Sequence, residues 1–452
     1  MVDADALERE TQRVGRELHA GFPTASRHPF KALDGRAMDY ASSDEALRAA
    51  LFRFVDVVPA CRNLDDLARH LTSFLGEVDE RPPSLDAAMR LSNSKAGRAA
   101  LGAAAAAGVK HMAHRFIIAE SHRDVDGHLR GLWRHGVASS LDLLGEATVT
   151  ASEADAYADR AADAVRTIAA AAPRWPPRPR LEHDFAGPIP RANVSVKVSG
   201  LTPLLRPDAP ERGKRDAAVR LRRLLVEARD RGAHLHIDTE SVDSLDAVLE
   251  LVLELLAEPE LAEGPSAGIV LQAYLRESPD RLRDVLAWAE ATPRAQPLTV
   301  RLVKGAYWDH EVVEARQHGW GVPVFEDKAE SDRNFEALSR ALIDAKPLVR
   351  TAIASHNLRS VAHAIAYNRL TGGDDADVEM QILRGLGDPL QTAIAAQGLR
   401  VRAYCPVGDL VAGMAYLVRR LLENTSNDSF LQEQARGAAI SELLAKPEPS
   451  TA

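Results

Sequence analysis

The feature that most constrains the fold of this chain is an alternation of short β-type runs with longer amphipathic stretches, which begins near residue 130. Apolar residues three and four positions apart indicate that the longer stretches are crossover helices. The eight β-type runs cover residues 137–146, 193–200, 234–240, 268–275, 298–305, 351–357, 378–383 and 399–408. Eight strand–helix repeats are typical of a parallel (βα)8 barrel of the TIM type.

An open doubly wound sheet is the alternative for the same alternation. That fold carries a glycine-rich phosphate-binding turn after its first strand, whereas "DLLGEATVTA" at 142–151 lacks the G-x-G-x-x-G spacing. The sequence therefore favours an α/β fold with a distorted (βα)8 barrel. The Pro-rich residues 173–180 and the loop at 203–213 are expected to be excursions around this barrel rather than domain boundaries.

The first 130 residues have a helical texture instead. Apolar residues recur every three to four positions over 4–22, 42–58 and 63–78, and the alanine-rich residues 96–107 favour a helix. We expect three parts: a helical N-terminal extension over 1–130, the barrel over 131–435 and a C-terminal tail over 436–452.

The composition excludes several classes of protein. With 46% hydrophobic and 27% charged residues, the chain is globular rather than disordered, and a net charge of -9 opposes binding to nucleic acid. Cys61 and Cys405 are too few for a disulfide framework, and no histidine pair stands at ligand spacing beside a carboxylate, so we expect a reducing compartment and no metal. No signal peptide is visible in residues 1–20. The longest apolar stretch, "AALGAAAAAGV", is well short of the ~20 residues that cross a bilayer.

Polar residues gather at the ends of the predicted strands, where the catalytic groups of a parallel barrel lie. They are Asp142, Glu146, Lys197, Asp238, Glu240, Gln272, Arg301, Lys304, His356, Asn357, Gln381 and Tyr404, followed by Arg419, Arg420 and Glu423 on the last helix. Any one of them has a structural explanation, such as a helix cap or a partner for a buried backbone group. Their shared position predicts a functional rim, and its many cations predict that the rim binds anions.

Eight peptides carry a resemblance to a known family. In chain order they are "VSVKVSGL", "HIDTES", "VLQAYL", "VRLVKGAYWDHE", "ASHN", "MQILRGLGDPL", "AYCPVG" and "AYLVRRLLENTSNDSF". From about residue 140 to Phe430 the chain resembles the proline dehydrogenase family, most closely the flavoprotein domain of the bifunctional proline utilisation enzymes.

The resemblance implies an FAD enzyme that oxidises L-proline to 1-pyrroline-5-carboxylate by hydride transfer to flavin N5, the first step of proline catabolism to glutamate. A quinone is the implied electron acceptor. The implied location is cytoplasmic, with peripheral contact at the inner face of the cell membrane. The sequence ends too soon after the last helix for the aldehyde dehydrogenase domain of bifunctional relatives. If the sequence is complete, a separate 1-pyrroline-5-carboxylate dehydrogenase is the expected partner, and if it is a fragment, that domain has been cut away.

By position, the resemblance also implies eight residues of a substrate pocket. The grip on the proline carboxylate is implied for Arg419, Arg420 and Lys197. Glu423 would orient Arg419 across an i to i+4 spacing. Tyr404 and Tyr416 are implied to be walls of the pocket, and Leu383 is implied to pack against the ring. Asp238 is the implied acid beside the pocket.

The cofactor residues follow in the same way. Arg301 resembles the arginine that reaches flavin N5, where negative charge accumulates on reduction. Gln272 resembles the contact to the isoalloxazine edge, and residues 304–308 resemble the loop that holds the phosphate and adenosine end. The full implied set is Gln272, Arg301, Val303, Lys304, Gly305, Ala306, Tyr307, Trp308, His356 and Asn357. For Tyr307 and Trp308 an aromatic core patch is the alternative.

Three departures from the family pattern leave the substrate open. Gly200 stands where relatives have "SAL", "DTES" stands where they have "DAEE", and Arg384 stands where a histidine is common. Two further hypotheses are therefore kept: a related flavoenzyme that oxidises another cyclic or secondary amine in a specialised pathway, and a flavin-free binding protein with the same barrel. Tyr404 favours proline over hydroxyproline, because a 4-hydroxyl group would crowd its ring.

Overall fold

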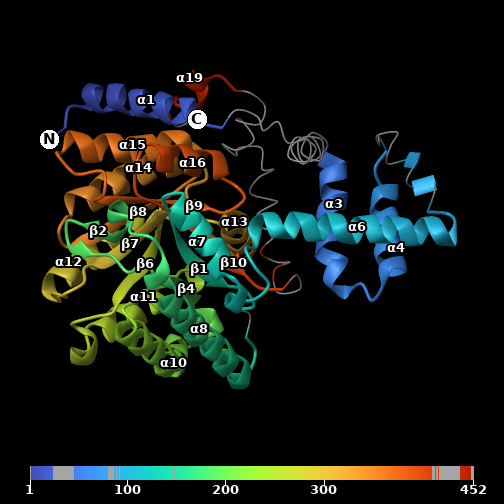
Figure 1. Ribbon diagram of the computed structural model, residues 1–452, viewed down its shortest axis with the longest axis horizontal. Coiled ribbons are helices and arrows are strands. Elements are labelled where there is room, and N and C mark those ends of the chain that lie inside the picture. The colour runs from blue at the N-terminus through green and yellow to red at the C-terminus, as the bar shows by residue number, and fades with distance from the viewer. Residues whose placement is uncertain are drawn as a thin grey trace.

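The computed structural model describes residues 2–23, 45–79, 86–87, 89–90, 92–146, 148–409, 413, 416 and 438–448. Its largest part is a closed barrel of eight parallel strands, each hydrogen-bonded to its neighbours in chain order, with the last strand paired to the first (Figure 1). The strands are β1 (Val137–Leu143), β4 (Asn193–Lys197), β5 (His234–Asp238), β6 (Ser266–Gln272), β7 (Leu298–Val303), β8 (Val349–Ala354), β9 (Val378–Leu383) and β10 (Val401–Val407). The predicted barrel is confirmed, and an open doubly wound sheet is excluded.

The closure of the barrel is uneven. Strand β1 pairs with β10 along its whole length, from Val137 opposite Val401 to Leu143 opposite Val407. It pairs with β4 only at Leu141 and Asp142. The predicted strand over 193–200 also stops early, because Val198–Gly200 turns into a 3-10 helix after Lys197. Lys197 is therefore the last strand residue and stands at the barrel rim.

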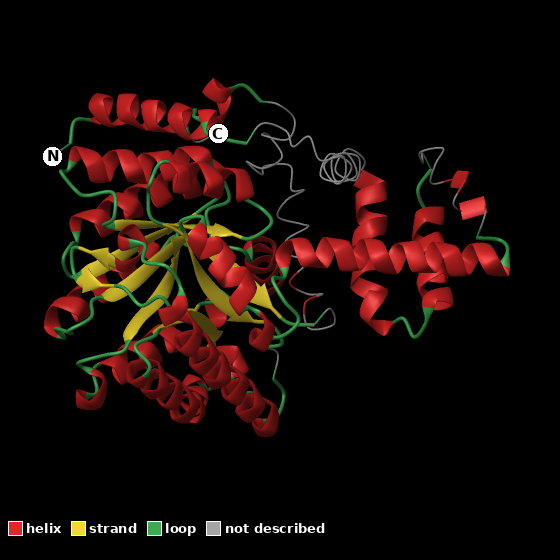
Figure 2. Cartoon of the chain, viewed as in Figure 1, coloured by secondary structure: helices red, strands yellow, loops and turns green. Residues whose placement is uncertain are grey.

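The crossover helices form a ring around the barrel (Figure 2). They are α8 (Ala151–Ala171), α10 (Pro210–Asp230), α11 (Val242–Leu256), α12 (Ser278–Ala291), α13 (Trp308–His318), α14 (Lys328–Asp344), α15 (Leu358–Leu370) and α16 (Asp388–Ala396). Local chemistry fixes where α8 begins: Thr150 accepts a hydrogen bond from the backbone of Glu153, whose carboxylate accepts one from the backbone of Thr150. Asn357 caps α15 by accepting from the backbone N–H of Ser360.

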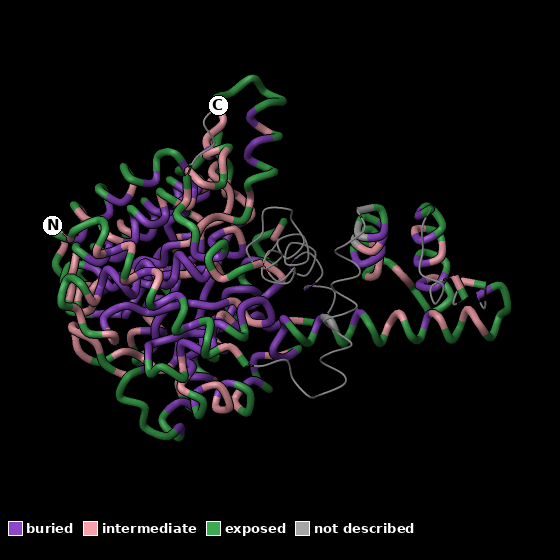
Figure 3. The backbone as a smooth tube through the Cα atoms, turned by 90° about the horizontal axis from the view of Figure 1, so that it is seen from above, coloured by how far each residue is buried: buried purple, intermediate pink, exposed green. Residues whose placement is uncertain are grey.

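The interior of the barrel is polar, unlike the apolar interior usual for this fold. Along β4, Val194 and Val196 are buried in the apolar core, whereas Ser195 hydrogen-bonds inside the barrel to Ser140 on the neighbouring strand β1 and to Arg301 on β7. Strand β5 alternates in the same way, with His236 inside and Leu235 in the apolar core. The apolar core is therefore the layer between strands and helices. Figure 3 shows that buried residues are concentrated in the barrel.

A small hairpin covers the amino ends of the strands. It consists of β2 (His183–Asp184) and β3 (Gly187–Pro188) and follows the Pro-rich stretch. Its Asp184 is buried and accepts hydrogen bonds from Arg350 at 2.8 Å and from Arg400 at 3.3 Å. The hairpin is thereby fixed to β8 and to the residue before β10.

The N-terminal helices lie in two places (Figure 1). Helices α3 (Glu45–Val57), α4 (Leu64–Gly76) and α6 (Lys95–Phe116) pack on one another and project away from the barrel. Helix α1 (Ala4–Ala20) instead lies on the barrel against α15, beside the short α19 (Ile440–Leu443). Helix α7 (Asp126–Arg134) leads into β1.

A buried ion cluster attaches α1 to the barrel. The guanidinium of Arg359 on α15 donates to Glu8 on α1, to Glu336 on α14 and to the carbonyl of Leu444, all at 2.8–2.9 Å. The Arg359 side chain is only 5% exposed. These four contacts join both ends of the described chain to one face of the barrel.

We expect Arg359→Met to destabilise the protein by ~3 kcal/mol, because the substitution leaves the buried Glu336 carboxylate without its closest cation. Arg13→Met on α1 is the matched control, since Arg13 forms exposed pairs with Glu10 and Glu17 and its loss should cost less than ~1 kcal/mol. Urea unfolding followed by circular dichroism measures both values. Equal losses for the two variants would contradict the role assigned to the cluster.

Candidate functional site

Three residues from three strands meet at the carboxyl end of the barrel. Asp238, the last residue of β5, accepts a hydrogen bond from the Arg301 guanidinium of β7 at 2.5 Å and one from the Tyr404 hydroxyl of β10 at 2.6 Å. The Arg301 guanidinium carbon also lies 5.2 Å from the centre of the Tyr404 ring. Both Arg301 and Asp238 are buried. The opposite charges of Arg301 and Asp238 stabilise each other away from solvent, and the Tyr404 ring lies against the same guanidinium.

Burial also decides the protonation of these groups. It raises the pKa of Tyr404 well above its usual value, so the hydroxyl stays protonated and donates to Asp238. Burial raises the pKa of Asp238 as well, although the charges of Arg301 and Lys197 oppose that shift. Arg301 and Asp238 therefore form a buried pair beside a neutral phenol.

A second buried pair joins β4 to β1. The Lys197 ammonium donates to Asp142 at 2.7 Å, and the two side chains are 10% and 1% exposed. Burial by itself would lower the pKa of Lys197, but Asp142 and the other acidic groups nearby outweigh it and raise that pKa well above 10.5. Lys197 is therefore a fixed cation at neutral pH. Asp142 was predicted at the rim, and the structure shows that it is the partner of Lys197.

Gln272 at the end of β6 is tied down on one side only. Its amide nitrogen donates to the Thr239 hydroxyl at 3.1 Å and to the Glu240 carbonyl at 2.7 Å. Its amide oxygen is buried and has no hydrogen-bond partner among the described residues. A buried acceptor without a donor is unfavourable, so this oxygen suits a ligand that brings an N–H group.

The loop after β7 lies between α14 and β6. Lys304 forms an ion pair with Asp332, and burial lowers the pKa of its ammonium while Asp332 opposes the shift. Gly305 has a φ of 133°, and a Cβ atom there would lie 2.4 Å from the Tyr274 ring. Only glycine fits this close approach. These two contacts fix the position of the loop beside the rim.

The two aromatic residues that follow begin α13. Trp308 is 39% exposed and donates its indole N–H to the Phe325 carbonyl at 2.8 Å. The alternative of an aromatic core patch is therefore wrong for Trp308. Tyr307 is the half-buried N-cap residue of the helix, and Ala306 before it is exposed. Val303, the last residue of β7, is half-buried.

His356 and Asn357 follow β8 but have different tasks. His356 accepts a hydrogen bond from the backbone N–H of Leu383 at 3.0 Å, so it connects the ends of β8 and β9. Asn357 uses its amide oxygen as the cap of α15. A helix cap was one structural explanation for the rim residues, and the structure shows it for Asn357.

The described part of the last helix is small. Arg419, Arg420 and Glu423 lie outside the described residues. Tyr416 is described and buried in an apolar cluster with Phe116 and Ile117 at the end of α6, against which Leu383 also packs. The end of the projecting helices thus lies next to two of the predicted pocket residues.

Two interior residues of this site, Ser195 and Glu379, were not predicted from the sequence. Gln381 was named as a rim residue, but its side chain is buried inside the barrel between Arg301 and Glu379. A signal for all three was present, because polar residues alternate with apolar ones in "NVSVK" and "VEMQIL". In a strand covered on both faces, such alternation indicates a polar interior.

The described residues show neither a metal centre nor a membrane span. Within the described ranges, no three or more His, Cys, Asp or Glu residues are grouped to hold a metal ion. None of the helices in that part of the chain is long and apolar enough to cross a membrane.

Comparison with known proteins identifies the family. The proline dehydrogenase family model matches residues 125–433, and the model of the proline utilization A N-terminal domain matches residues 8–116. Since the first match covers more than half of the chain, this protein belongs to the proline dehydrogenase family.

Individual relatives agree with this assignment. The bifunctional protein PutA of Klebsiella aerogenes is 32% identical over 409 residues, which are 87% of this chain and 28% of that protein. The proline dehydrogenase of Deinococcus radiodurans is 30% identical over 322 residues, or 71% of this chain and 89% of that protein. The crystal structure of proline utilization A from Bdellovibrio bacteriovorus inactivated by N-propargylglycine has a TM-score of 0.88 at 33% identity and covers 98% of this chain. This chain spans less than half the length of these PutA proteins.

We expect the Lys197–Asp142 pair to be strongly coupled. Lys197→Met and Asp142→Asn should each cost ~3 to 5 kcal/mol of unfolding free energy, because each leaves a buried charge unpaired. The double variant should cost at least ~1 kcal/mol less than the sum. Urea unfolding of the four proteins measures this coupling, and additive costs would contradict it.

The same pair predicts a pH dependence at the alkaline end. Since the folded pKa of Lys197 is raised above 10.5, its contribution to stability is complete below pH 10.5 and falls as the pH rises through the folded value. Unfolding free energies measured from neutral to alkaline pH should show this loss in the wild type. Asp142→Asn should reduce it, and an unchanged alkaline slope would argue against the pairing.

Proposed function

We propose that this protein is an FAD-dependent proline dehydrogenase, which oxidises L-proline to 1-pyrroline-5-carboxylate by hydride transfer to flavin N5. The observation that carries the proposal is the convergence of Lys197, Asp238, Arg301 and Tyr404 at the barrel rim of a chain in this family. Bound FAD would supply the hydride acceptor, and the protein would supply binding, orientation and charge. The reaction is the first step of proline catabolism to glutamate.

The substrate side is assigned from charge and shape. Lys197 is a fixed cation that can face the proline carboxylate, with Arg419 and Arg420 proposed to complete the grip. Tyr404, Tyr416 and Leu383 are proposed as walls around the apolar ring, and Asp238 holds the Tyr404 hydroxyl in place. A carboxylate held in this way keeps the ring carbon next to nitrogen in one orientation, and such positioning supplies several kcal/mol toward a barrier.

The flavin side is assigned from two features: the Gln272 oxygen, which has no partner among the described residues, and the buried cation of Arg301. The buried Gln272 oxygen matches the N–H group at the pyrimidine edge of an isoalloxazine ring. Arg301 is proposed to face N5, where a fixed positive charge favours the reduced state. Lys304, Gly305, Ala306, Tyr307 and Trp308 are proposed to hold the phosphate and adenosine end, while Val303, His356 and Asn357 line the remainder.

The partners follow from the chemistry. A quinone is proposed to reoxidise the flavin, with the protein in the cytoplasm and in peripheral contact with the inner face of the membrane. The product is proposed to pass to a 1-pyrroline-5-carboxylate dehydrogenase. The PutA relatives are named bifunctional proteins, which supports a coupled second step for this chain's product.

A flavin spectrum tests the proposal directly. Purified protein reconstituted with FAD should be yellow, and L-proline should bleach it under anaerobic conditions because the electrons stay on the flavin. Bleaching by another cyclic amine but not by proline would support the specialised-pathway hypothesis. Protein that takes up no FAD would support the flavin-free hypothesis.

Two sets of arginine variants separate the substrate and flavin roles. Arg419→Met or Arg420→Met should raise KM for proline by about 30-fold or more, the equivalent of ~2 kcal/mol, with little change in flavin content. Arg301→Met should make the flavin harder to reduce. Arg283→Met at an exposed surface position is the control. An unchanged KM in the Arg419 and Arg420 variants would refute their assignment.

A further inference from the structure

The guanidinium of Arg301 is held from inside the barrel as well as from the rim. Besides its contact with Asp238, it donates from Nε to the Gln381 amide oxygen at 2.6 Å and from its third nitrogen to the Ser195 hydroxyl at 3.3 Å. Gln381 and Arg301 are 5% and 4% exposed. Each nitrogen of the guanidinium therefore has a partner on a different strand, and Gln381 is its closest partner on the interior side.

The orientation of the Gln381 amide is fixed by its two neighbours. Arginine has only donors, so the amide must turn its oxygen toward Arg301. On the other side the amide nitrogen donates to Glu379 at 2.7 Å. Burial works to raise the pKa of Glu379, but the charges of Arg402 and Arg400 lower it to about 2. Glu379 is thus an ionised acceptor at neutral pH, and a flipped Gln381 would lose both hydrogen bonds.

Glu379 is itself rigidly held. Arg402 donates to both of its oxygens, at 2.7 and 2.9 Å, and also to the Ser139 carbonyl at 2.7 Å. The Nε atom of Arg400 lies 3.7 Å from the same carboxylate, and Arg400 also contacts Asp184 of the hairpin. A chain of buried polar contacts therefore runs from Arg301 to the hairpin at the opposite mouth of the barrel.

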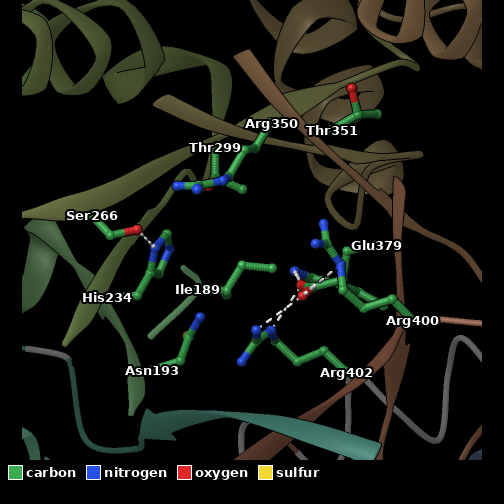
Figure 4. A pocket seen from close by; sticks show the side chains of 11 residues that line it. Ile189, Asn193, His234, Ser266, Thr299, Arg350, Thr351, Glu379, Arg400 and Arg402 are labelled. Atoms are coloured by element: carbon green, nitrogen blue, oxygen red, sulfur yellow. Dashed lines mark hydrogen bonds and ion pairs between the residues drawn. The ribbon is translucent and has the colours of Figure 1, made fainter. Parts of the chain in front are cut away.

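That mouth contains a small polar cavity, shown in Figure 4. Glu379, Arg400 and Arg402 lie on one side of it, and His234 with its partner Ser266 lies on the other. Ser266 contacts neither Arg301, Gln381 nor Glu379 in the hydrogen bonds of the described chain. Ser266 therefore lies beside this series of buried polar contacts without taking part in it, which makes it a suitable control position.

We propose that Gln381 and Glu379 are positioning residues that fix the direction of the Arg301 guanidinium toward the flavin. The inference rests on the proposed function, because it gives Arg301 its task. Gln381 supplies the oriented acceptor, Glu379 keeps the amide from flipping, and the arginines at the far mouth hold Glu379. The contribution of Arg301 to catalysis then depends on residues that never touch substrate or cofactor.

The test compares Gln381→Met with the wild type in the full chain loaded with FAD. Methionine keeps the length of the side chain but leaves the Arg301 Nε–H without its acceptor. We expect kcat with proline to fall by ~10- to 100-fold, as for a lost hydrogen bond to a charged group, and KM to stay within about twofold. The midpoint potential of the flavin, measured against a reference dye with a chemical reductant, should become more negative.

Three further variants make the result decisive. Ser266→Ala should leave kcat and the potential unchanged. Gln381→Glu keeps an oxygen toward Arg301 but loses the donor to Glu379 and places two carboxylates together, so its kcat should also fall below that of the wild type. Glu379→Gln should shift kcat and the potential in the same direction as Gln381→Met, and it serves as the second route if Gln381→Met does not fold. Unchanged kcat and potential in Gln381→Met, or equal losses in Ser266→Ala, would overturn the inference.

The potential does not depend on proline, so the two proposals fail separately. If proline does not bleach the flavin but the potential still shifts in Gln381→Met, only the substrate assignment is overturned. If proline bleaches the flavin but the variants behave like the wild type, only the positioning role is overturned. A wild-type chain that takes up no FAD overturns both.

Discussion

The buried guanidinium of Arg301 is the constraint on which the rest of the site depends. Its partners, Asp238, Gln381 and Ser195, lie on three other strands. An unpaired charge in this interior would cost several kcal/mol, so β4, β5, β7 and β9 must keep their stagger for the contacts to form. The contacts of Arg301 therefore require the closed barrel and the geometry of its rim at the same time. A shift of any of these strands by two residues would break both.

Two cations of the site that the structure describes, Lys197 and Arg301, are paired before a ligand arrives. Lys197 has Asp142, and Arg301 has Asp238. Pairing keeps Lys197 charged where burial alone would favour its neutral form. An incoming carboxylate would then meet a preformed positive charge that needs little rearrangement, which is the condition for tight orientation. The Gln272 oxygen, which has no hydrogen-bond partner among the described residues, is the complementary feature, since it is an acceptor ready for a donor on the ligand.

The projecting N-terminal helices are connected to the same rim. After α6, Ile118 donates its backbone N–H to Pro406 at 2.9 Å, and Ala119 forms a parallel bridge with Val407 at the end of β10. Phe116 and Ile117 pack with Tyr416, and a Cβ atom on Gly413 would lie 2.4 Å from Ile117. The wall of the proposed pocket is thus built partly from residues outside the barrel. The helix α1, by contrast, is attached to the outer ring through Arg359.

The sequence by itself determined the eight strands, the crossover helices and the polar residues at the strand ends, because these follow from local periodicity and position along the chain. It also indicated the family, through eight short peptides in a fixed order, and the proline dehydrogenase family model matches residues 125–433. Only the tertiary structure decided which acid pairs with which cation, that Gln381 lies inside the barrel, and that α1 lies apart from α3, α4 and α6. The physical reason is that such pairings join strands far apart in the chain, as in the contact between Asp238 and Tyr404, which are 166 residues apart. They depend on the stagger of the closed sheet, which no local pattern contains.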